Sequence, residues 1–446
     1  MSRFPGGGGS TPTAHRKEGE LKLQAKDRRV QRFVARHRKA PAFRWQDMTD
    51  PRDRRGRRWE LGQLLDAAFD GMLAGCRTLR DVEALTEELG GDGRGRVPRR
   101  VPDTTLYEVL EDLSIEELRG KLRQQVRTLW RAKSVEPQGL PCGVMSVDGK
   151  TIGVLEHDAD GTAQKSHSER RPDGRPYWLA RVLRAALTSS AARVALDQAP
   201  VPPETNEMGT FASFFDALVE SYDPLFEVVT VDAGLTSRAH ADRIHAADKA
   251  YVMAIKGPQP ELLAEAKRLL DPRQKEAPDA ETPWERASGK EVRRRLWRTA
   301  EIAGYHDWTH LQQAWRIAQE TRSSDGNVEV EERYFLTSLR PGRLTPTQSL
   351  LVVRGHWGIE NDCFWSLDMQ WREDDGPWST RGRAVEVLGL LRLMAYNLLQ
   401  LVRKRHLRER RPDGELAAPP AWRRVFEWVR QALRLPARVD PIPDNG

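Results

Sequence analysis

Three acidic residues in this chain have the type and spacing that metal-dependent chemistry requires. Asp148 and Asp232 each follow a short run rich in valine, which predicts that each lies at the end of a strand. Glu360 interrupts an apolar stripe at helical spacing, formed by Trp357, Phe364 and Leu367. A carboxylate on a buried face is costly unless a cation shares its site, and a pair of Mg²⁺ ions needs rigid oxygen ligands with room for a phosphate. The three residues therefore indicate phosphodiester chemistry on nucleic acid.

Each carboxylate also has an explanation that involves no metal. Asp148 and Asp232 are both followed by turn residues, so each could form a turn or cap a helix. Glu360 could instead pair with Arg354 or His356 inside a core. Because these separate explanations would all have to hold at once, we favour a shared metal site.

Several polar neighbours of the carboxylates are candidate DNA contacts. Lys150 lies two residues after the first aspartate and Lys256 ends another predicted strand. Each could reach a phosphate, although a surface lysine fits the pattern equally well. Asn361 adjoins Glu360, and Asp368 could hold a metal ligand in place or be an ordinary surface residue.

Basic residues are concentrated in runs. Lys and Arg total 72 against 65 Asp and Glu, a formal net charge of +7, so the excess itself is modest. The four runs are Arg28, Arg29, Arg32, Arg36, Arg38 and Lys39; Arg52, Arg54, Arg55, Arg57 and Arg58; Arg293, Arg294, Arg295 and Arg298; and Arg403, Lys404, Arg405, Arg408, Arg410 and Arg411. Any single run could be a solvated surface, but such runs also suit a phosphate backbone. Beside a predicted metal site, they favour DNA as the partner.

Size and composition are those of a polar globular protein. The 446 residues can form two or three domains, and 31% of them are charged and 39% hydrophobic. The cysteines Cys76, Cys142 and Cys363 lie too far apart to indicate a disulfide framework or a zinc site. No apolar stretch approaches the roughly 20 residues of a membrane span, and the N-terminus lacks a signal-peptide core. We expect a soluble protein of a reducing compartment, with no membrane partner.

Changes in pattern along the chain predict four regions. Residues 1–57 form a basic, partly disordered arm, and residues 58–138 form an all-helical domain that could bind DNA. Residues 139–405 carry the strand-like runs and the three carboxylates, with a β-rich insertion at about 258–344. Residues 406–446 form a linker and a last amphipathic helix over 422–435.

The expected elements define the fold class. In the helical domain they are helices at 61–72, 78–89, 103–113 (with Asp103 as the N-cap) and 115–132. Further on, strands are expected at 144–147, 177–188, 192–197, 228–231, 251–256, 290–302, 313–320 and 329–338, with helices at 208–222, 237–247 and 384–405. Hairpin strands followed by a crossover helix and more strands predict a mixed α/β sheet.

Short motifs around these residues recur in a fixed order. They are Val147-Asp148-Gly149-Lys150, Thr205-Asn206-Glu207, Val231-Asp232-Ala233-Gly234, 251–259, 332–339, 354–361, 372–375 and Asn397. Together they resemble the DDE transposases of bacterial insertion sequences, and most closely the ISAs-type, or H-repeat-associated, group. Each motif alone is weak, whereas their order and spacing are specific and cover most of the chain.

The resemblance implies a ribonuclease H-like catalytic core. Asp148 would lie on its first strand, Asp232 after its fourth, and Glu360 on a helix behind the sheet, and these carboxylates would hold two Mg²⁺ or Mn²⁺ ions. The implied activity is cleavage of DNA at the ends of the element and strand transfer into target DNA. The implied partners are the terminal inverted repeats, target DNA and a second copy of the chain, acting at the nucleoid in the bacterial cytoplasm.

The chain departs from the broader transposase class at two positions. That class has an arginine four residues before the glutamate and a lysine seven residues after it, where this chain has His356 and Leu367. His356 would then replace a phosphate-binding arginine, and Arg354 could supply the charge. Two other functions stay open: a catalytically silent DNA-binding protein derived from a transposase, and a stand-alone ribonuclease H-like nuclease.

Overall fold

The fold is taken from a computed structural model of the full chain. It describes residues 28–30, 32–34, 36, 40–55, 57–91, 100–287, 289–308, 310–323, 325–376, 378–379, 381–408 and 416–434. Parts of some predictions lie outside the described residues: most of the expected N-terminal arm, and basic residues Arg38, Lys39, Arg410 and Arg411.

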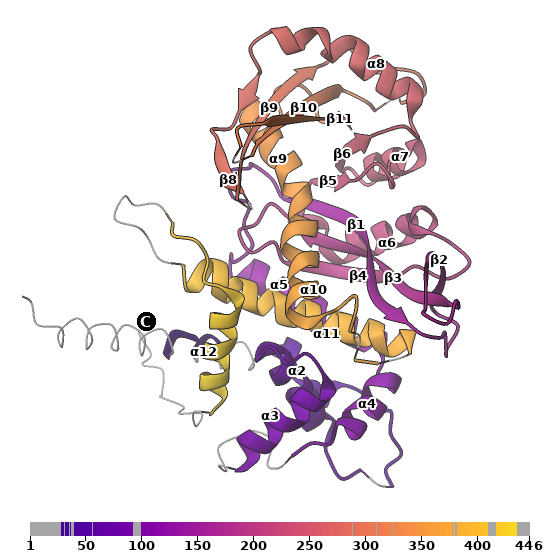
Figure 1. The fold of residues 1–446 in the computed structure, drawn as a ribbon, viewed down its shortest axis with the longest axis vertical. Helices are drawn as coiled ribbons and strands as arrows, with labels where there is room; N and C mark the ends of the chain where they lie inside the picture. The colour runs from indigo at the N-terminus through magenta and orange to yellow at the C-terminus, as the bar shows by residue number, and fades with distance from the viewer. Residues whose placement is uncertain are drawn as a thin grey trace, which may run out of the picture.

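Five strands form the centre of the molecule (Figure 1). Their order is β4 (Ala195–Pro200), β3 (Pro176–Leu187), β1 (Val144–Leu155), β5 (Val228–Val231) and β6 (Ala250–Ile255). The first three pair antiparallel, and β1, β5 and β6 pair parallel. This mixed α/β sheet confirms the ribonuclease H-like fold class expected from the sequence.

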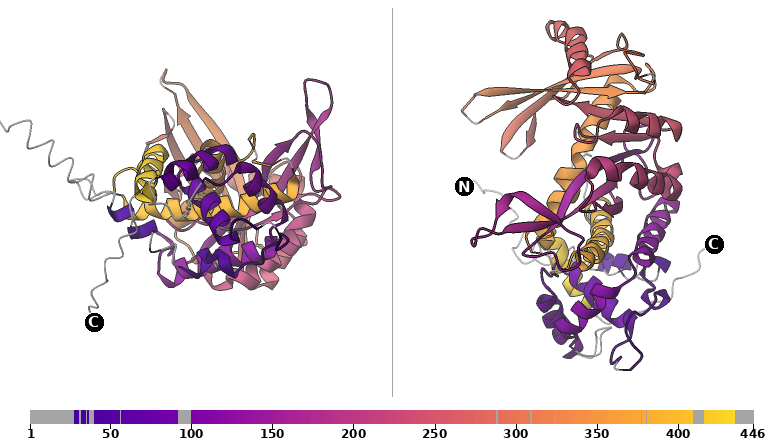
Figure 2. Two further views of the ribbon diagram at one scale, coloured as in Figure 1. Left: turned by 90° about the horizontal axis from the view of Figure 1, so that it is seen from below. Right: turned by 90° about the vertical axis from the view of Figure 1, so that its right-hand side faces the viewer.

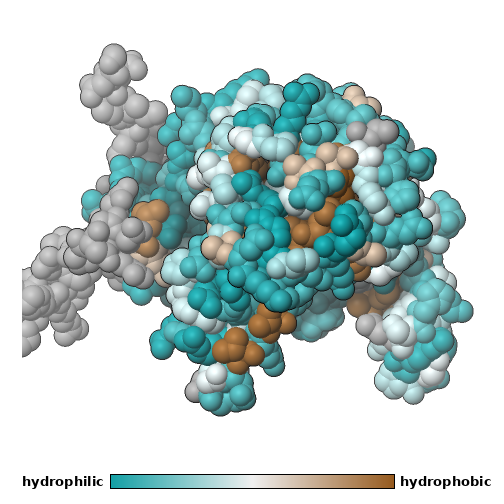
Figure 3. Space-filling view, turned by 90° about the horizontal axis from the view of Figure 1, so that it is seen from above, coloured by the Kyte–Doolittle hydropathy of each residue, from teal (hydrophilic) through white to brown (hydrophobic). Residues whose placement is uncertain are grey.

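The insertion continues the same sheet. Strand β11 (Val328–Thr337) pairs antiparallel with β6, and β10 (Gln313–Arg322) and β9 (Lys290–Thr299) follow beside it. The short strands β7 (Ala280–Glu281) and β8 (Glu285–Ala287) both pair with β9. Figure 3 views this end of the molecule, where the surface is mostly hydrophilic with small separate apolar patches.

Besides the short strands β7 and β8, one helix and one longer strand were not expected from the sequence. Helix α8 (Pro260–Leu270) opens the insertion and packs on β9, β10 and β11, with Leu262, Ala266 and Leu270 buried at helical spacing. Strand β2 (Gln164–Arg170) pairs with β3 in a stretch where no strand was expected.

Helices cover both faces of the sheet. On one face lie α6 (Glu207–Tyr222), which packs on β3 and β4, and α7 (Arg238–Ala246), which packs on β6. On the other lie α9 (Pro346–Gly358) and α11 (Gly382–Leu401). Between α9 and α11 the chain forms a π-helical turn, η5 (Ile359–Phe364), and the short helix α10 (Trp365–Trp371).

Helix α11 is long and apolar enough to cross a membrane. With the π-helical turn η6 (Val402–His406) it spans 25 residues, and its most apolar 18-residue window has a mean hydropathy of 1.5 and is 100% buried inside the protein. The expectation that no apolar stretch approaches the length of a membrane span was therefore wrong. The burial is that of a core helix, because α11 packs against the sheet on one side and against N-terminal helices on the other.

The N-terminal helices lie at the opposite end from the insertion (Figure 2). They are α2 (Leu61–Leu73), α3 (Leu79–Gly91), α4 (Asp103–Asp112) and α5 (Ile115–Arg131), and α12 (Trp422–Arg434) packs beside α2. Asp103 is the first helical residue and Pro102 takes the N-cap position, so the predicted cap was one residue off. Short 3-10 turns complete the described structure at Pro41–Phe43, Trp45–Asp47, Asp223–Leu225 and Pro272–Lys275.

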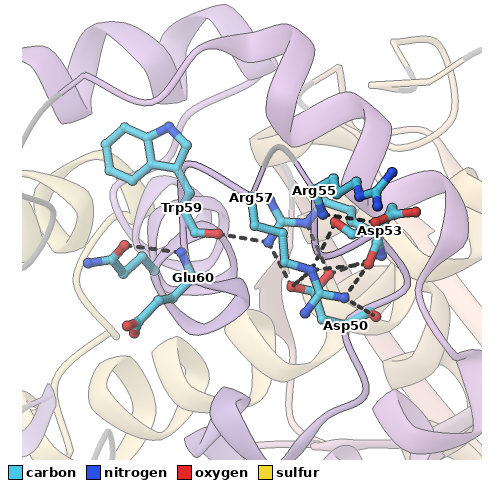
Figure 4. A network of polar contacts seen from close by, with 8 residues as sticks. Asp50, Asp53, Arg55, Arg57, Trp59 and Glu60 are labelled. Carbon is cyan, nitrogen blue, oxygen red and sulfur yellow. Dashed lines mark hydrogen bonds and ion pairs between the residues drawn. The ribbon is translucent and has the colours of Figure 1, made fainter.

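The second basic run is folded back on acidic neighbours (Figure 4). Arg52 pairs with Asp50 at 2.8 Å and also donates to the Trp59 carbonyl oxygen at 2.8 Å. Arg57 lies 3.4 Å from the same Asp50 carboxylate. These two arginines therefore stabilise the loop that leads into α2.

A buried cluster joins the N-terminal helices to the sheet. Arg119 of α5 donates to Asp197 of β4 at 3.0 Å and lies 3.5 Å from Glu386 of α11. Burial raises the pKa of Glu386 to about 7, although Arg119 opposes the shift. Asp197 and Glu116 add to the rise through their negative charges.

Glu386→Gln should remove part of the pH dependence of stability. Because the folded protein holds a proton on Glu386 that the unfolded chain releases near pH 4.5, the wild type loses stability as pH rises from about 4.5 to 7. The variant has no such proton, so its advantage should grow through that window to at most about 3 kcal/mol and then stay level. Urea unfolding of both proteins from pH 5 to 9 measures this; a constant difference across the series would contradict it.

Candidate active site

The two aspartates lie side by side at the end of a parallel strand pair. The register of β1 and β5 places Val147 opposite Val231, so Asp148 and Asp232 follow at the same level on neighbouring strands, about 4.8 Å apart in the sheet direction. Asp148 accepts from the Gly149 amide at 2.8 Å and Asp232 from the Leu235 amide at 3.0 Å. The Asp232 carboxylate therefore shapes the turn that follows β5, as the metal-free explanation expected. The expectation that Asp148 ends its strand and begins a turn was wrong, because β1 continues to Leu155 and stays paired with β3.

Glu360 reaches this edge from the helical side. It lies in the π-helical turn η5 and is exposed, whereas Phe364 and Leu367 are buried. The prediction that Glu360 belongs to the buried stripe was wrong, because a π-turn closes its hydrogen bonds over five residues and breaks the 3.6-residue periodicity. Such turns recur at functional sites.

The three carboxylates act on one another. Burial raises the pKa of Asp148 to about 8, and the charges of Asp232 and Glu360 add to the shift. Partial desolvation by the surrounding protein also raises the pKa of Glu360, although its side chain stays open to solvent; Arg333 and Lys256 oppose the rise and Asp232 adds to it. The negative charge of the three carboxylates is therefore not fully balanced by the positive side chains of Arg333 and Lys256.

This donor set suits a hard divalent cation in an open site. Carboxylate oxygens are the ligands that Mg²⁺ and Mn²⁺ prefer, and Mg²⁺ in phosphate-processing sites takes one or two carboxylates and fills its other positions with water and substrate. Throughout the described part of the chain, no three His, Cys, Asp or Glu side chains lie close enough to enclose a metal on their own. The residues therefore fit ions that a bound phosphate helps to hold.

The candidate lysines differ in their surroundings. Lys150 forms a close ion pair with Asp368 and lies over the Phe364 ring at 5.7 Å, so its charge is turned towards η5 and α10. Lys256 is exposed at the end of β6 and near enough to Glu360 to lower the pKa of that carboxyl. Of the two, Lys256 is the better placed to meet a phosphate.

His356 is part of the core. Its side chain is 4% exposed, and Nδ1 lies 3.0 Å from the Thr230 hydroxyl. Thr230 in turn lies 2.7 Å from the Ser146 hydroxyl across the β1–β5 pair. Because burial lowers the pKa of His356 to about 4, the ring is neutral at physiological pH. It fixes α9 to the sheet and has no access to a phosphate.

A cleft of about 780 Å³ opens beside Glu360. Its basic lining residues are Arg193, Arg294, Arg333, Arg354, Lys404 and Arg408. Arg354 is held by Glu285 at 2.7 Å, and Arg333 lies over the Trp357 ring at 4.3 Å. Asn361 lines the same cleft.

The cleft gathers residues from two of the predicted basic runs. In β9 successive side chains alternate, so Arg294 faces the cleft while Arg293 and Arg295 both pair with Glu320. Lys404 comes from the fourth run and pairs with Asp362 at 3.0 Å. The runs were visible in the sequence, but which of their members share a surface depends on the fold.

Two cleft arginines were not among the candidate DNA contacts predicted from the sequence. Arg193 sits in the turn between β3 and β4 with a φ of 47°, outside any basic run. Arg333 alternates with acidic residues along β11 and pairs with Glu331 at 2.7 Å. Only the placement of β11 beside α9 brings Arg333 to the glutamate.

A family model described as the transposase DDE domain matches residues 143–398. Two proteins of Escherichia coli strain K12, the H repeat-associated protein YhhI and the protein YbfL, are each 35% identical over 71 residues, which is 16% of this chain and 18% of each relative. The chain thus matches only a small part of either relative's length.

The fold was also compared with solved structures. A piggyBac transposase synaptic complex with hairpin DNA aligns over 88% of this chain and 75% of that chain, with a TM-score of 0.40 and 10% sequence identity.

Proposed function

Since this chain belongs to the transposase DDE domain family, we propose that it is a DNA transposase that cuts at the ends of an insertion sequence and joins them to target DNA. The observation that carries the proposal is the position of Asp148 and Asp232, each directly after the last residue pair of the β1–β5 pairing, with Glu360 near them from η5. This arrangement brings three carboxylates to one open edge of a sheet beside a basic cleft.

We propose that Asp148, Asp232 and Glu360 are the catalytic residues and hold two Mg²⁺ or Mn²⁺ ions. Bound ions of this kind activate water or a DNA 3′-hydroxyl and stabilise the leaving oxygen of an in-line displacement. The chain's own contribution is position: the sheet register fixes the two aspartates, and the hydrogen bond of His356 to Thr230 holds α9, which leads into Glu360.

The substrate proposed for the cleft is the DNA backbone. Arg294, Arg333 and Arg354 lie on one side of Glu360 and crowd each other, so that burial and then the charges of Arg354 and Arg333 lower the pKa of Arg294. Phosphate groups would relieve that repulsion. Asn361, which follows Glu360 in the chain and lines the cleft, and Lys256, whose charge acts on Glu360, complete the proposed contacts.

Arg354→Gln should weaken DNA binding and reduce its salt dependence. One phosphate contact fewer lowers the slope of log affinity against log salt by about 1, uniformly across DNA sequences. The matched control is Arg423→Gln, whose side chain on α12 is 91% exposed and pairs only with Glu427 among the described residues. Fluorescence anisotropy at several salt concentrations measures both. Equal slopes for the two variants would remove Arg354 from the proposed DNA contacts.

The further parts of the proposal concern partners and organisation. We propose that the chain acts as a homodimer on the element's terminal inverted repeats and on target DNA, in the bacterial cytoplasm at the nucleoid. Residues 58–138 would contribute DNA contacts, residues 139–405 the catalytic centre with its insertion at about 258–344, and residues 406–446 an accessory helix.

The decisive experiment is a cleavage assay on DNA that carries the element's own ends, with and without Mg²⁺. Wild type should cut only with the metal, and Glu360→Gln should bind the same DNA without cutting it. Binding without cutting by wild type would favour the silent DNA-binding protein, and cutting without strand transfer would favour the nuclease.

A further inference from the structure

A fourth carboxylate approaches the same edge from the other face of the sheet. Glu207 is the first residue of α6, and its side chain packs directly against Gly149, the neighbour of Asp148 in β1. A methyl group built on Gly149 would overlap the Glu207 carboxylate. The glycine therefore leaves a space at the strand edge that this carboxylate fills.

The strand geometry explains how Glu207 can join the other carboxylates. Asp148 and Gly149 point to opposite faces of β1, so a side chain from α6 meets the glycine and not the aspartate. Pairing between β1 and β5 ends at Val147 and Val231, so no β5 backbone separates the two faces beyond that point. At this open edge a carboxylate from either face can approach the same position.

The surroundings of Glu207 leave its charge largely unsatisfied. It is half-buried, and no hydrogen bond to its carboxylate is found within the described residues. Its neighbour Asn206 uses its own side chain to cap α6 on the Gly209 amide at 3.0 Å. Arg181 is the nearby cation, and it lines a small cavity of about 180 Å³ together with Glu207 and Gly234.

Glu207 also acts on both aspartates. Burial chiefly raises the pKa of Glu207, and the charge of Asp232 adds to the rise. Glu207 in turn is one of the groups that raise the pKa of Asp148. Two carboxylates from the sheet, one from η5 and one from α6 thus lie around the point where the pairing of β1 with β5 ends.

We propose that Glu207 is a further metal ligand of the proposed active site and binds one of the divalent cations from the α6 side, over Gly149. This inference rests on the proposed function, because it requires the ions that Asp148, Asp232 and Glu360 are proposed to hold. It assigns a specific role to the space at Gly149: any side chain there would push the fourth carboxylate away from the ions.

The test is Mn²⁺ binding by the full chain, followed by electron paramagnetic resonance and calorimetry. Glu207→Gln should weaken Mn²⁺ binding by about tenfold or more, the scale expected for a group that supports a metal. The matched control is Glu204→Gln, because Glu204 is exposed in the turn just before α6. It should bind Mn²⁺ like wild type, and thermal melting without metal should show that both variants are folded.

A double-mutant cycle with Gly149→Ala tests whether the space at Gly149 is what allows the Glu207 carboxylate to reach the metal ions. If that substitution acts by displacing Glu207, adding Glu207→Gln to it should cause no further loss of Mn²⁺ affinity. Losses that multiply would mean that the glycine and the glutamate act independently, and would overturn the proposal.

Three outcomes separate this proposal from the proposed function. Loss of Mn²⁺ binding in both Asp148→Asn and Glu207→Gln supports both. Loss in Asp148→Asn with wild-type binding in Glu207→Gln overturns the role of Glu207 alone; a lowered melting temperature in that variant would then assign Glu207 to a structural pair with Arg181. Absence of Mn²⁺ binding in wild type, with DNA carrying the element's ends present, overturns both.

Discussion

Replacement of Asp148 by asparagine should abolish DNA cleavage and at the same time make the metal-free protein harder to unfold. Asparagine keeps the acceptor oxygen that the Gly149 amide uses but removes a charge that burial and neighbouring carboxylates disfavour. Losing one oxygen ligand to a catalytic ion is worth several kcal/mol, so cleavage should fall by about 10²–10³-fold. DNA binding should persist, because the cleft arginines are unchanged.

The gain in stability should depend on pH with a definite sign. The pKa of Asp148 is raised to about 8 in the folded protein, so wild type binds a proton that the unfolded chain releases near pH 3.8. Wild-type stability therefore falls as pH rises between these values, and the advantage of Asp148→Asn grows until about pH 8. Thermal melting at pH 6 and 9 without divalent ions measures this.

Added Mg²⁺ should reverse the order of the melting temperatures of wild type and Asp148→Asn. An ion that binds the folded state raises the melting temperature of wild type and leaves the variant nearly unchanged. If Asp148→Asn destabilised the protein at pH 9 without metal, the carboxylates would not repel one another, and the argument for a shared cation site would fail.

Glu373→Ala should be among the most destabilising single substitutions in the chain. Arg184 of β3 and Glu373 after α10 form an ion pair in which both side chains are 0% exposed, with bonds of 2.9 and 3.1 Å. Gln198 also accepts from Arg184, at 2.7 Å. Removing one partner of a buried pair leaves an uncompensated charge and costs about 3–5 kcal/mol.

The matched control for this prediction is Glu427→Ala on α12. Glu427 pairs with Arg423 at 3.0 Å, but these side chains are 54% and 91% exposed. An exposed helical pair contributes about 0.5 kcal/mol or less. Urea unfolding of both variants compares them directly, and similar losses would show that the Arg184 pair is solvated or replaced by other contacts.

Much of the fold could be predicted from local patterns. The valine-rich run at 228–231 became β5 with the expected bounds, and the helix expected at 78–89 became α3, which Thr78 and Asp81 cap with reciprocal hydrogen bonds. The family resemblance drawn from motif order is confirmed by the family match over 143–398. In contrast, α8 was missed because a stretch dominated by strand patterns hid an eleven-residue amphipathic helix.

The candidate site was predicted less completely, for a physical reason. The valine-rich runs led to Asp148 and Asp232, and parallel pairing of β1 with β5 brings the two aspartates together. The expected strand end at Asp148 was wrong, because β1 continues to Leu155 on its pairing with β3, which the valine-rich run alone does not show. A π-turn has no comparable pattern in the sequence, so the burial expected for Glu360 was wrong, and its role as a metal ligand stays a prediction. His356 was predicted to contact phosphate, because helical periodicity does not show that its side chain lies in the core and hydrogen-bonds to the Thr230 hydroxyl.

The burial of α11 also decides when the protein can fold during its synthesis. The N-terminal helices α2, α4 and α5 pack against α11, and so does β4 from the sheet, yet α11 begins only at Gly382. The ribosome must therefore deliver most of the chain before these early segments can bury their apolar faces. A copy of the gene interrupted before the codon of Gly382 would encode a polypeptide without α11, so both its N-terminal helices and its sheet would lack their packing partner. We do not expect such a polypeptide to form a stable DNA-binding fragment.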